Sequence, residues 1–206
     1  MPTLSRPNAV LCLLLALPAM VLAAGLANGE PWRFAIRPSG DVATKLLVVT
    51  LCLSPLRALF PQGRWIAWLV SRRRIFGLSA FFYALFHVVV FSASIGRLDW
   101  IIEGMAFASM WTGWAAFALL AGIASISNAG AAVRLGVWWK RIQRLAYPVL
   151  VLSIAHWLLL SRFPLEATLH LAPVVVLWSC VLVMRYYFGS ETKSGPGRLR
   201  AESSGR

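Results

Sequence analysis

The 206-residue sequence is poor in the groups that carry chemistry in soluble enzymes, with only three histidines, three cysteines and seven acidic residues. The cysteines (Cys12, Cys52 and Cys180) each stand alone in an apolar run, which favours a role as small hydrophobic residues. No CxxC, CxxCH, GxGxxG or P-loop pattern is present, and no loop exceeds about 20 residues. These absences exclude a zinc-type site, a covalently attached haem and an NAD(P)H-binding domain.

Apolar side chains dominate instead: 59% of the residues are hydrophobic, and the mean hydropathy is +0.72. A soluble domain of this size cannot cover so much apolar surface with polar atoms. Crossing a hydrocarbon core about 30 Å thick takes about 20 apolar residues. We therefore expect an all-α integral membrane protein, a bundle of six transmembrane helices over about 9–27, 42–60, 75–96, 105–127, 145–161 and 167–184.

The distribution of charge predicts how this bundle is oriented. Of the twenty Lys and Arg residues, fifteen lie at one set of helix ends, and only five lie at the other set: Arg33, Arg37, Lys45, Arg97 and Arg162. The positive-inside rule then places both termini in the cytoplasm. Because topology accounts for the charge, we expect no nucleic-acid partner.

The two ends of the chain carry separate expectations. The first apolar segment has features of a cleaved signal peptide, but its length favours a retained span. We expect 1–188 to form one six-helix membrane domain, in contact with lipid. The last stretch, 189–206, is polar, rich in Gly and Ser and basic, which is typical of a disordered cytoplasmic tail.

Two histidines lie inside apolar segments, where ionisable residues are costly and usually functional. His87 follows Arg74 by 13 residues, and His156 follows Arg144 by 12, on helices that rise from the same side. At 1.5 Å per residue both imidazoles lie about 18–20 Å above that edge. Two neutral imidazoles at one depth fit the axial positions of one haem iron. The alternative is that they only link helices by hydrogen bonds.

Further residues are candidates for supporting roles. His170 lies near the outer interface and is either a polar surface residue or a fallback ligand. Haem propionates need cations at an interface, and Arg97 and Arg162 lie on the outer side. The basic inner loops offer a place for a flavin phosphate or a quinone headgroup, although topology alone explains them.

Four stretches resemble one known family. They are SRRRIFGLSAFFYALFHVVVF (71–91), SGDVATKLLVVTLCLSPLR (39–57), WTGWAAFALLAGIASISN (111–128) and RLGVWWKRIQRLAYPVLVLSIAHWLLL (134–160). They are similar to helices three, two, four and five of the MsrQ family, also called YedZ, within the ferric-reductase-like transmembrane superfamily. MsrQ proteins are the haem-binding membrane subunits of bacterial periplasmic methionine sulfoxide reductase systems.

The resemblance implies a six-helix b-type cytochrome of the bacterial inner membrane. Electrons would come from the quinone pool or a cytoplasmic flavin donor and leave to a periplasmic molybdopterin reductase. His87 and His156 match haem ligands of the family, and Arg73 and Arg74 match an arginine pair before the third helix. The chain would be an electron-transfer subunit rather than a stand-alone enzyme.

One position departs from the family pattern. Gln143 stands where relatives usually carry a second histidine at the start of the fifth helix, and glutamine is a poor iron ligand. We therefore expect one haem b, with the inner site empty or served by another ligand, FMN or a quinone. Two other functions stay open: a direct membrane ferric reductase, and a non-redox helical membrane protein.

Overall fold

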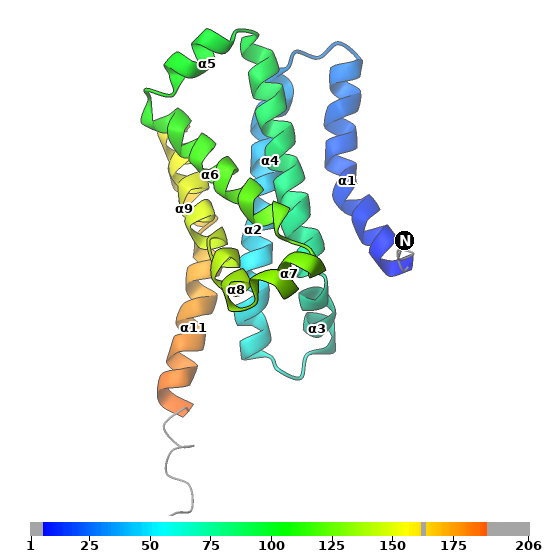
Figure 1. Cartoon of the computed structure of the whole chain (residues 1–206), viewed down its shortest axis with the longest axis vertical. Helices are drawn as coiled ribbons and strands as arrows, with labels where there is room; N and C mark the ends of the chain where they lie inside the picture. Colours follow the sequence, from blue (N-terminus) through cyan, green and yellow to red (C-terminus); the bar gives the residue numbers. More distant parts are fainter. Residues whose placement is uncertain (1–5, 162–163, 189–206) are drawn as a thin grey trace, which may run out of the picture.

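The computed structural model describes residues 6–161 and 164–188, which form helices and contain no strand (Figure 1). Six stretches are long and apolar enough to cross a membrane: 7–27, 33–59, 73–95, 108–125, 137–160 and 165–184. The expected all-α, six-helix membrane bundle is confirmed. Arg162 and the predicted tail over 189–206 lie outside the described residues. The helices are α1 (Arg6–Ala27), α2 (Arg33–Leu59), α3 (Arg64–Ser71), α4 (Arg73–Ile95), α5 (Leu98–Gly104), α6 (Ala108–Ser125), α7 (Ala129–Leu135), α8 (Val137–Gln143), α9 (Ala146–Leu160), α10 (Pro164–Leu169) and α11 (Ala172–Phe188).

The start of α2 differs most from expectation, because the helix begins at Arg33 rather than near residue 42. The prediction placed the start after the cluster of charged residues. In the structure Arg37, Asp41 and Lys45 follow one another at four-residue intervals, so they share one side of the helix. The opposite side stays apolar or small and is buried, so the charges do not interrupt the helix.

Two antiparallel helix pairs make up the centre of the bundle. The closest packing joins α2 to α4 and α6 to α9, while α11 packs on α2 (Figure 1). We call α2 with α4 the first hairpin and α6 with α9 the second hairpin. In Figure 1 α6 crosses in front of the first hairpin and α9 lies to its left, with α5 connecting the two hairpins at the upper end.

The main core fills the space between the two hairpins. Its most buried members include Leu51 of α2, Ala80 of α4, Leu120 of α6 and Ile154 of α9, and none exposes more than 6% of its surface. Burying a leucine or isoleucine contributes about 1.5–3 kcal/mol. This core fixes the depth at which each helix of one hairpin meets the other.

Helix α1 lies outside this core but is tied to α4 by one side chain. The Tyr83 hydroxyl donates to the Leu15 carbonyl (2.7 Å) and accepts from the Ala19 amide (2.9 Å). It therefore stands between two groups that would otherwise bond each other within α1, next to Pro18. A polar insertion of this kind, beside a proline, is a recognised cause of a helix kink.

Candidate functional site: a histidine pair between two hairpins

The structure brings His87 and His156 together at the contact between the two hairpins. His87 lies on α4 and His156 on α9, with ring centroids 6.4 Å apart and ring planes at 87°. Both side chains are half-buried. Residues 69 positions apart in the sequence thus form one pair of facing imidazoles.

Each imidazole is oriented by a backbone carbonyl of its own hairpin. His87 Nδ1 donates to the Ile36 carbonyl of α2 (2.8 Å), and His156 Nδ1 donates to the Ser109 carbonyl of α6. A carbonyl only accepts hydrogen bonds, so these contacts place the proton on Nδ1 of each neutral ring. Within the described residues neither Nε2 has a hydrogen-bond partner, so each Nε2 lone pair is available to a metal.

The two carbonyls belong to a repeated local arrangement. Ile36 is followed by Ser39 and Gly40, and Ser109 is followed, at the same spacing, by Thr112 and Gly113. We call each set of carbonyl, hydroxyl and glycine a histidine seat.

Each hydroxyl of a histidine seat makes its shorter hydrogen bond to the carbonyl four residues earlier, Ser39 to Ala35 (2.6 Å) and Thr112 to Ala108 (2.7 Å). It makes a longer contact with the carbonyl that receives the imidazole. The Ser39 hydroxyl lies 2.9 Å from the Ile36 carbonyl oxygen, and the Thr112 hydroxyl lies 3.1 Å from the Ser109 oxygen. Ser39 Oγ also lies 3.3 Å from His87 Nδ1. Both hydroxyl side chains are buried, which is unusual for polar groups without a structural task.

The glycine of each seat lets the imidazole reach the helix backbone. A Cβ atom at Gly40 would lie 3.0 Å from His87 Nδ1, and one at Gly113 would lie 2.7 Å from His156 Nδ1. Real Cβ atoms essentially never come closer than 3.0 Å to a neighbour of this kind. Glycine is therefore required at Gly113 for this ring position, and it is strongly favoured at Gly40.

The two Nε2 atoms of His87 and His156 suit a metal whose other ligands come from a cofactor. No group of three or more His, Cys, Asp or Glu side chains gathers anywhere in residues 6–161 and 164–188. A metal–imidazole bond is about 2 Å long, so an ion held between two Nε2 atoms sets the ring centroids roughly 6 Å apart. The observed 6.4 Å fits that requirement. A macrocycle-bound iron, which needs only two further ligands, could be held by such a pair of imidazoles.

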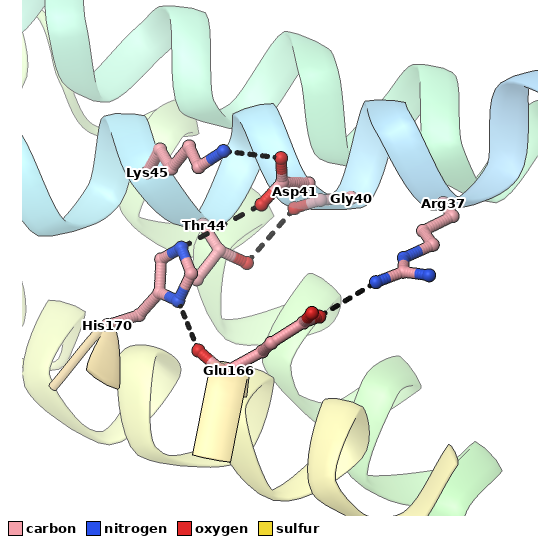
Figure 2. Close-up of polar contacts among 7 residues, drawn as sticks. All are labelled: Arg37, Gly40, Asp41, Thr44, Lys45, Glu166 and His170. Carbon is pink, nitrogen blue, oxygen red and sulfur yellow. Dashed lines mark hydrogen bonds and ion pairs between the residues drawn. The ribbon is translucent and has the colours of Figure 1, made fainter. Parts of the chain in front are cut away.

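His170, the fallback ligand, is not part of this pair. It lies in the turn between α10 and α11, where its Nδ1 donates to the Glu166 carbonyl (2.7 Å). Its Nε2 lies 3.8 Å from Asp41 Oδ1, and its ring lies against Trp157, with centroids 4.8 Å apart. Figure 2 shows the ring directed at the charged side of α2.

Of the two arginines expected to hold haem propionates, the structure describes Arg97, which has local partners. Arg97 pairs with Asp99, which holds the pKa of that carboxyl below its usual range, and stacks over Trp100 at 4.8 Å. It lies ten residues after His87, about 15 Å along the chain direction of α4. Arg162 lies outside the described residues.

The inner candidates lie apart from the histidine pair. Arg73 donates to the Ser54 hydroxyl of α2 (2.9 Å), and Arg74 is exposed at the start of α4. Both precede His87 by at least 13 residues, which is about 20 Å of helix. Gln143, at the end of α8, donates to the Ser127 hydroxyl (3.1 Å).

Sequence reasoning missed both histidine seats. It found no convincing internal repeat, because a hydroxyl residue followed by glycine is common in apolar helices. The signal is the recurrence of that dipeptide in two helices that each precede a histidine-bearing helix. Only helix pairing shows that each glycine meets an imidazole.

Six apolar helices define a multi-pass helical membrane protein. Two of these helices bring together a pair of imidazoles, each oriented by a backbone carbonyl, that could hold a metal cofactor. No family model matches the chain. It is 33% identical over 173 residues to the "Protein-methionine-sulfoxide reductase heme-binding subunit MsrQ" of Azospira oryzae, covering 77% of this chain and 70% of that protein. The protein of the same name from Herminiimonas arsenicoxydans is 29% identical over 187 residues, or 87% and 82% of the two chains. The chain belongs to the MsrQ family, as the resemblance predicted.

Proposed function

We propose that this chain is the haem-binding membrane subunit of a methionine sulfoxide reductase system, with His87 and His156 as the axial ligands of a b-type haem. The observation that carries the proposal is the 6.4 Å separation of the two imidazoles, each with Nδ1 bound to a carbonyl. The names of the two relatives support the cofactor and the system.

The residues around the pair have defined tasks in this proposal. The Ile36 and Ser109 carbonyls hold the imidazoles in the tautomer that presents Nε2 and raise the basicity of that nitrogen. Gly40 and Gly113 keep the space that the rings occupy. When bound, the haem supplies reversible one-electron transfer, and the protein supplies its position and ligation.

We infer one haem for each chain. The inner level offers Gln143, which is bonded to Ser127, and the exposed Arg74, and neither is a good iron ligand. Any flavin or quinone at the inner end would have to use Arg74 or the neighbouring basic loops, because Arg73 is bonded to Ser54.

The surroundings of the subunit follow from the family and from charge. We infer a bacterial inner-membrane location with both termini in the cytoplasm, from the excess of Lys and Arg at one set of helix ends. Electrons would enter from the quinone pool or from a cytoplasmic flavin donor. They would leave at the outer end to a periplasmic molybdopterin reductase that repairs oxidised methionine.

A pyridine haemochrome assay with protein quantitation tests the cofactor directly. We expect a b-type spectrum with one haem for each chain, lost in His87→Ala and in His156→Ala but kept in His170→Asn. A colourless wild-type protein, purified after expression with ample haem, would show that the proposal is wrong. A haem content that falls in His170→Asn but not in His156→Ala would assign the ligands differently.

The acceptor is tested by comparing two reactions in vesicles. We expect methionine sulfoxide reduction when a periplasmic molybdopterin reductase is added, and little reduction of ferric chelates in its absence. Rapid ferric-chelate reduction without any partner would identify a direct metalloreductase instead.

A further inference from the structure

A ladder of charged side chains connects α2 to the segment α10–α11 (Figure 2). Lys45 Nζ lies 2.6 Å from Asp41 Oδ2, and Arg37 Nη2 lies 2.8 Å from Glu166 Oε2. His170 Nε2 lies 3.8 Å from Asp41 Oδ1, so the imidazole is the link between the two ends of the ladder. The two cations and two carboxylates balance, and the ladder carries no net charge when His170 is neutral.

The ladder reaches into the hydrophobic part of the bundle. Lys45 lies 12 residues from Arg33 at one end of α2 and 12 residues from Arg57 at the other. At 1.5 Å per residue that is about 18 Å from Arg57, inside a hydrocarbon core about 30 Å thick. Its side chain is 56% exposed. Ionised side chains at such depth usually mark a substrate or proton site.

Beside the ladder lies a groove of about 240 Å³. Its walls are mostly apolar, and two of its lining residues have polar side chains, Lys45 and His170. The lining residues are Lys45, Val48, Val49, Leu169, His170 and Pro173. Val49 and Leu169 are exposed, so the groove opens on the side of the bundle that faces lipid. It is smaller than the roughly 300–1,000 Å³ of sites that enclose a whole ligand, and it suits one ring whose tail stays in the bilayer.

The groove and the histidine pair share one turn of α2. Gly40 faces the His87 imidazole, and the next residue, Asp41, faces His170 and Lys45. A molecule held in the groove is therefore one helix width from a proposed haem ligand. The inner arginines are about 20 Å further along α4.

We propose that this groove binds the ring of a lipid-soluble hydroquinone and is the place where electrons enter the subunit. The assignment rests on the proposed function, because the iron held by His87 and His156 is the one-electron acceptor that it needs. A neutral ring with an apolar tail matches the uncharged ladder, the apolar walls and the opening to lipid. A phospholipid headgroup fits less well, because it carries an ionised phosphate and the walls of the groove are mostly apolar.

Hydroquinone oxidation in the groove releases protons and electrons, and each has a place to go. Oxidation of a hydroquinone to a quinone breaks two O–H bonds and releases two protons and two electrons. Nε2 of neutral His170 is a proton acceptor, because Nδ1 carries the hydrogen bonded to Glu166, and the Asp41 carboxylate stabilises the imidazolium that forms. The protons leave one at a time through His170 toward the outer water, and the electrons pass singly to the iron acceptor. Lys45 donates a hydrogen bond to a ring oxygen.

The experiment compares two reductants on full-length protein in liposomes. A reduced benzoquinone with a ten-carbon tail should reduce wild-type haem rapidly. Lys45→Met and His170→Asn should slow that reaction about tenfold or more, the cost of losing a hydrogen bond to a charged group. Dithionite should give the wild-type reduced spectrum and haem content in both variants. Lys45→Arg, which keeps a cationic donor, should restore most of the rate.

Lys140→Met, on the inner side, is the matched control and should keep the wild-type rate. If it slows the quinol reaction while Lys45→Met does not, the groove assignment is wrong and entry is at the inner end. Absence of haem from wild-type protein would instead show that the proposed function itself is wrong.

A second measurement on wild-type protein does not depend on any variant folding. An azido-benzoquinone of the same tail length should label peptides that contain 45–49 and 169–173 after illumination. Excess unlabelled quinone should abolish this labelling, and added phospholipid should not. Labelling elsewhere, or competition by phospholipid, would overturn the assignment.

Discussion

Two levels of the bundle can be compared, because α4 and the α8–α9 segment each place one residue at both. We call the level of His87 and His156 the outer level, and the level of Arg74 and Gln143 the inner level. At the outer level His87 and His156 bond carbonyls through Nδ1 and leave Nε2 without a partner among the described residues. Thirteen residues below each of them stand Arg74, which is exposed, and Gln143, whose amide donates to Ser127. The outer level therefore presents two ring nitrogens without a hydrogen-bond partner among the described residues, whereas the Gln143 amide of the inner level is already bonded.

The difference comes from the helices that face the two levels. At the outer level α2 and α6 each present a glycine, so an imidazole can reach the backbone. At the inner level the end of α6 offers the Ile126 carbonyl to the Trp139 indole (3.1 Å) and the Ser127 hydroxyl to Gln143. The Trp139 indole and the Gln143 amide thus bond two of the polar groups at the end of α6.

The largest effect is expected for Gly113→Ala, which should weaken haem binding at the outer level. The added Cβ would lie 2.7 Å from His156 Nδ1 and must displace the ring from its carbonyl. Loss of a group that orients a metal ligand typically weakens metal binding about 10–100-fold. Haem titration of the purified apoprotein measures this change.

Gly122→Ala is the matched control, because it lies on the same helix and its Cβ would meet nothing within 4 Å. It should bind haem as the wild type does. Equal affinities for the two variants would show that the glycine of the seat does not position His156.

Gly40→Ala should have the same kind of effect on the first hairpin but a smaller one. Its Cβ would lie 3.0 Å from His87 Nδ1, so a shift of a few tenths of an ångström relieves the contact. We expect weaker haem binding than wild type and stronger binding than Gly113→Ala. Gly77→Ala, whose Cβ would lie 3.7 Å from Thr50, should match the wild type. An affinity for Gly40→Ala below that of Gly113→Ala would reverse the order derived from the two distances.

The sequence alone predicted the six spans and the common depth of His87 and His156. Apolar segments predicted six spans, and counting from Arg74 and Arg144 placed His87 and His156 at one level, because helical rise is the same in every helix. The start of α2 was wrong by nine residues, because charges along one side of a helix look like a loop when only composition is read.

The two histidine seats were beyond reach for another reason. The groups that orient the imidazoles are backbone carbonyls, and every residue has one. The carbonyl that accepts the imidazole hydrogen bond is decided by the way α2 packs on α4 and α6 packs on α9. No local sequence pattern predicts this pairing. The ladder around His170 was missed similarly, because Asp41 and His170 are 129 residues apart.

Gln143→Leu should leave haem content unchanged, because the inner level is not expected to bind haem. It removes the hydrogen bond to Ser127 and should lower the free energy of unfolding by about 1 kcal/mol. Haem stoichiometry and thermal unfolding of the same preparation measure the two quantities. A halved haem content would reveal a second haem at the inner level and contradict the proposed count.

The smallest effects are expected for the hydroxyls of the seats. Ser39→Ala and Thr112→Val remove hydroxyls whose shorter hydrogen bonds go to the Ala35 and Ala108 carbonyls. Only their longer contacts reach the Ile36 and Ser109 carbonyls, and each of these stays bonded to its imidazole. We expect full haem content and a small shift of the haem midpoint potential, because the carbonyl becomes a stronger acceptor for Nδ1. Loss of haem in either variant would mean that the hydroxyl, rather than the carbonyl, orients the ring.

The two-hairpin construction has a consequence for how the protein is assembled. Each hairpin carries one imidazole together with its own carbonyl and glycine, so each can complete its half of the site independently. A cofactor held between the halves then contributes directly to the association of the hairpins, and its binding energy becomes part of the energy of folding. Without haem the two hairpins would still share the main core, but their association would lack this contribution.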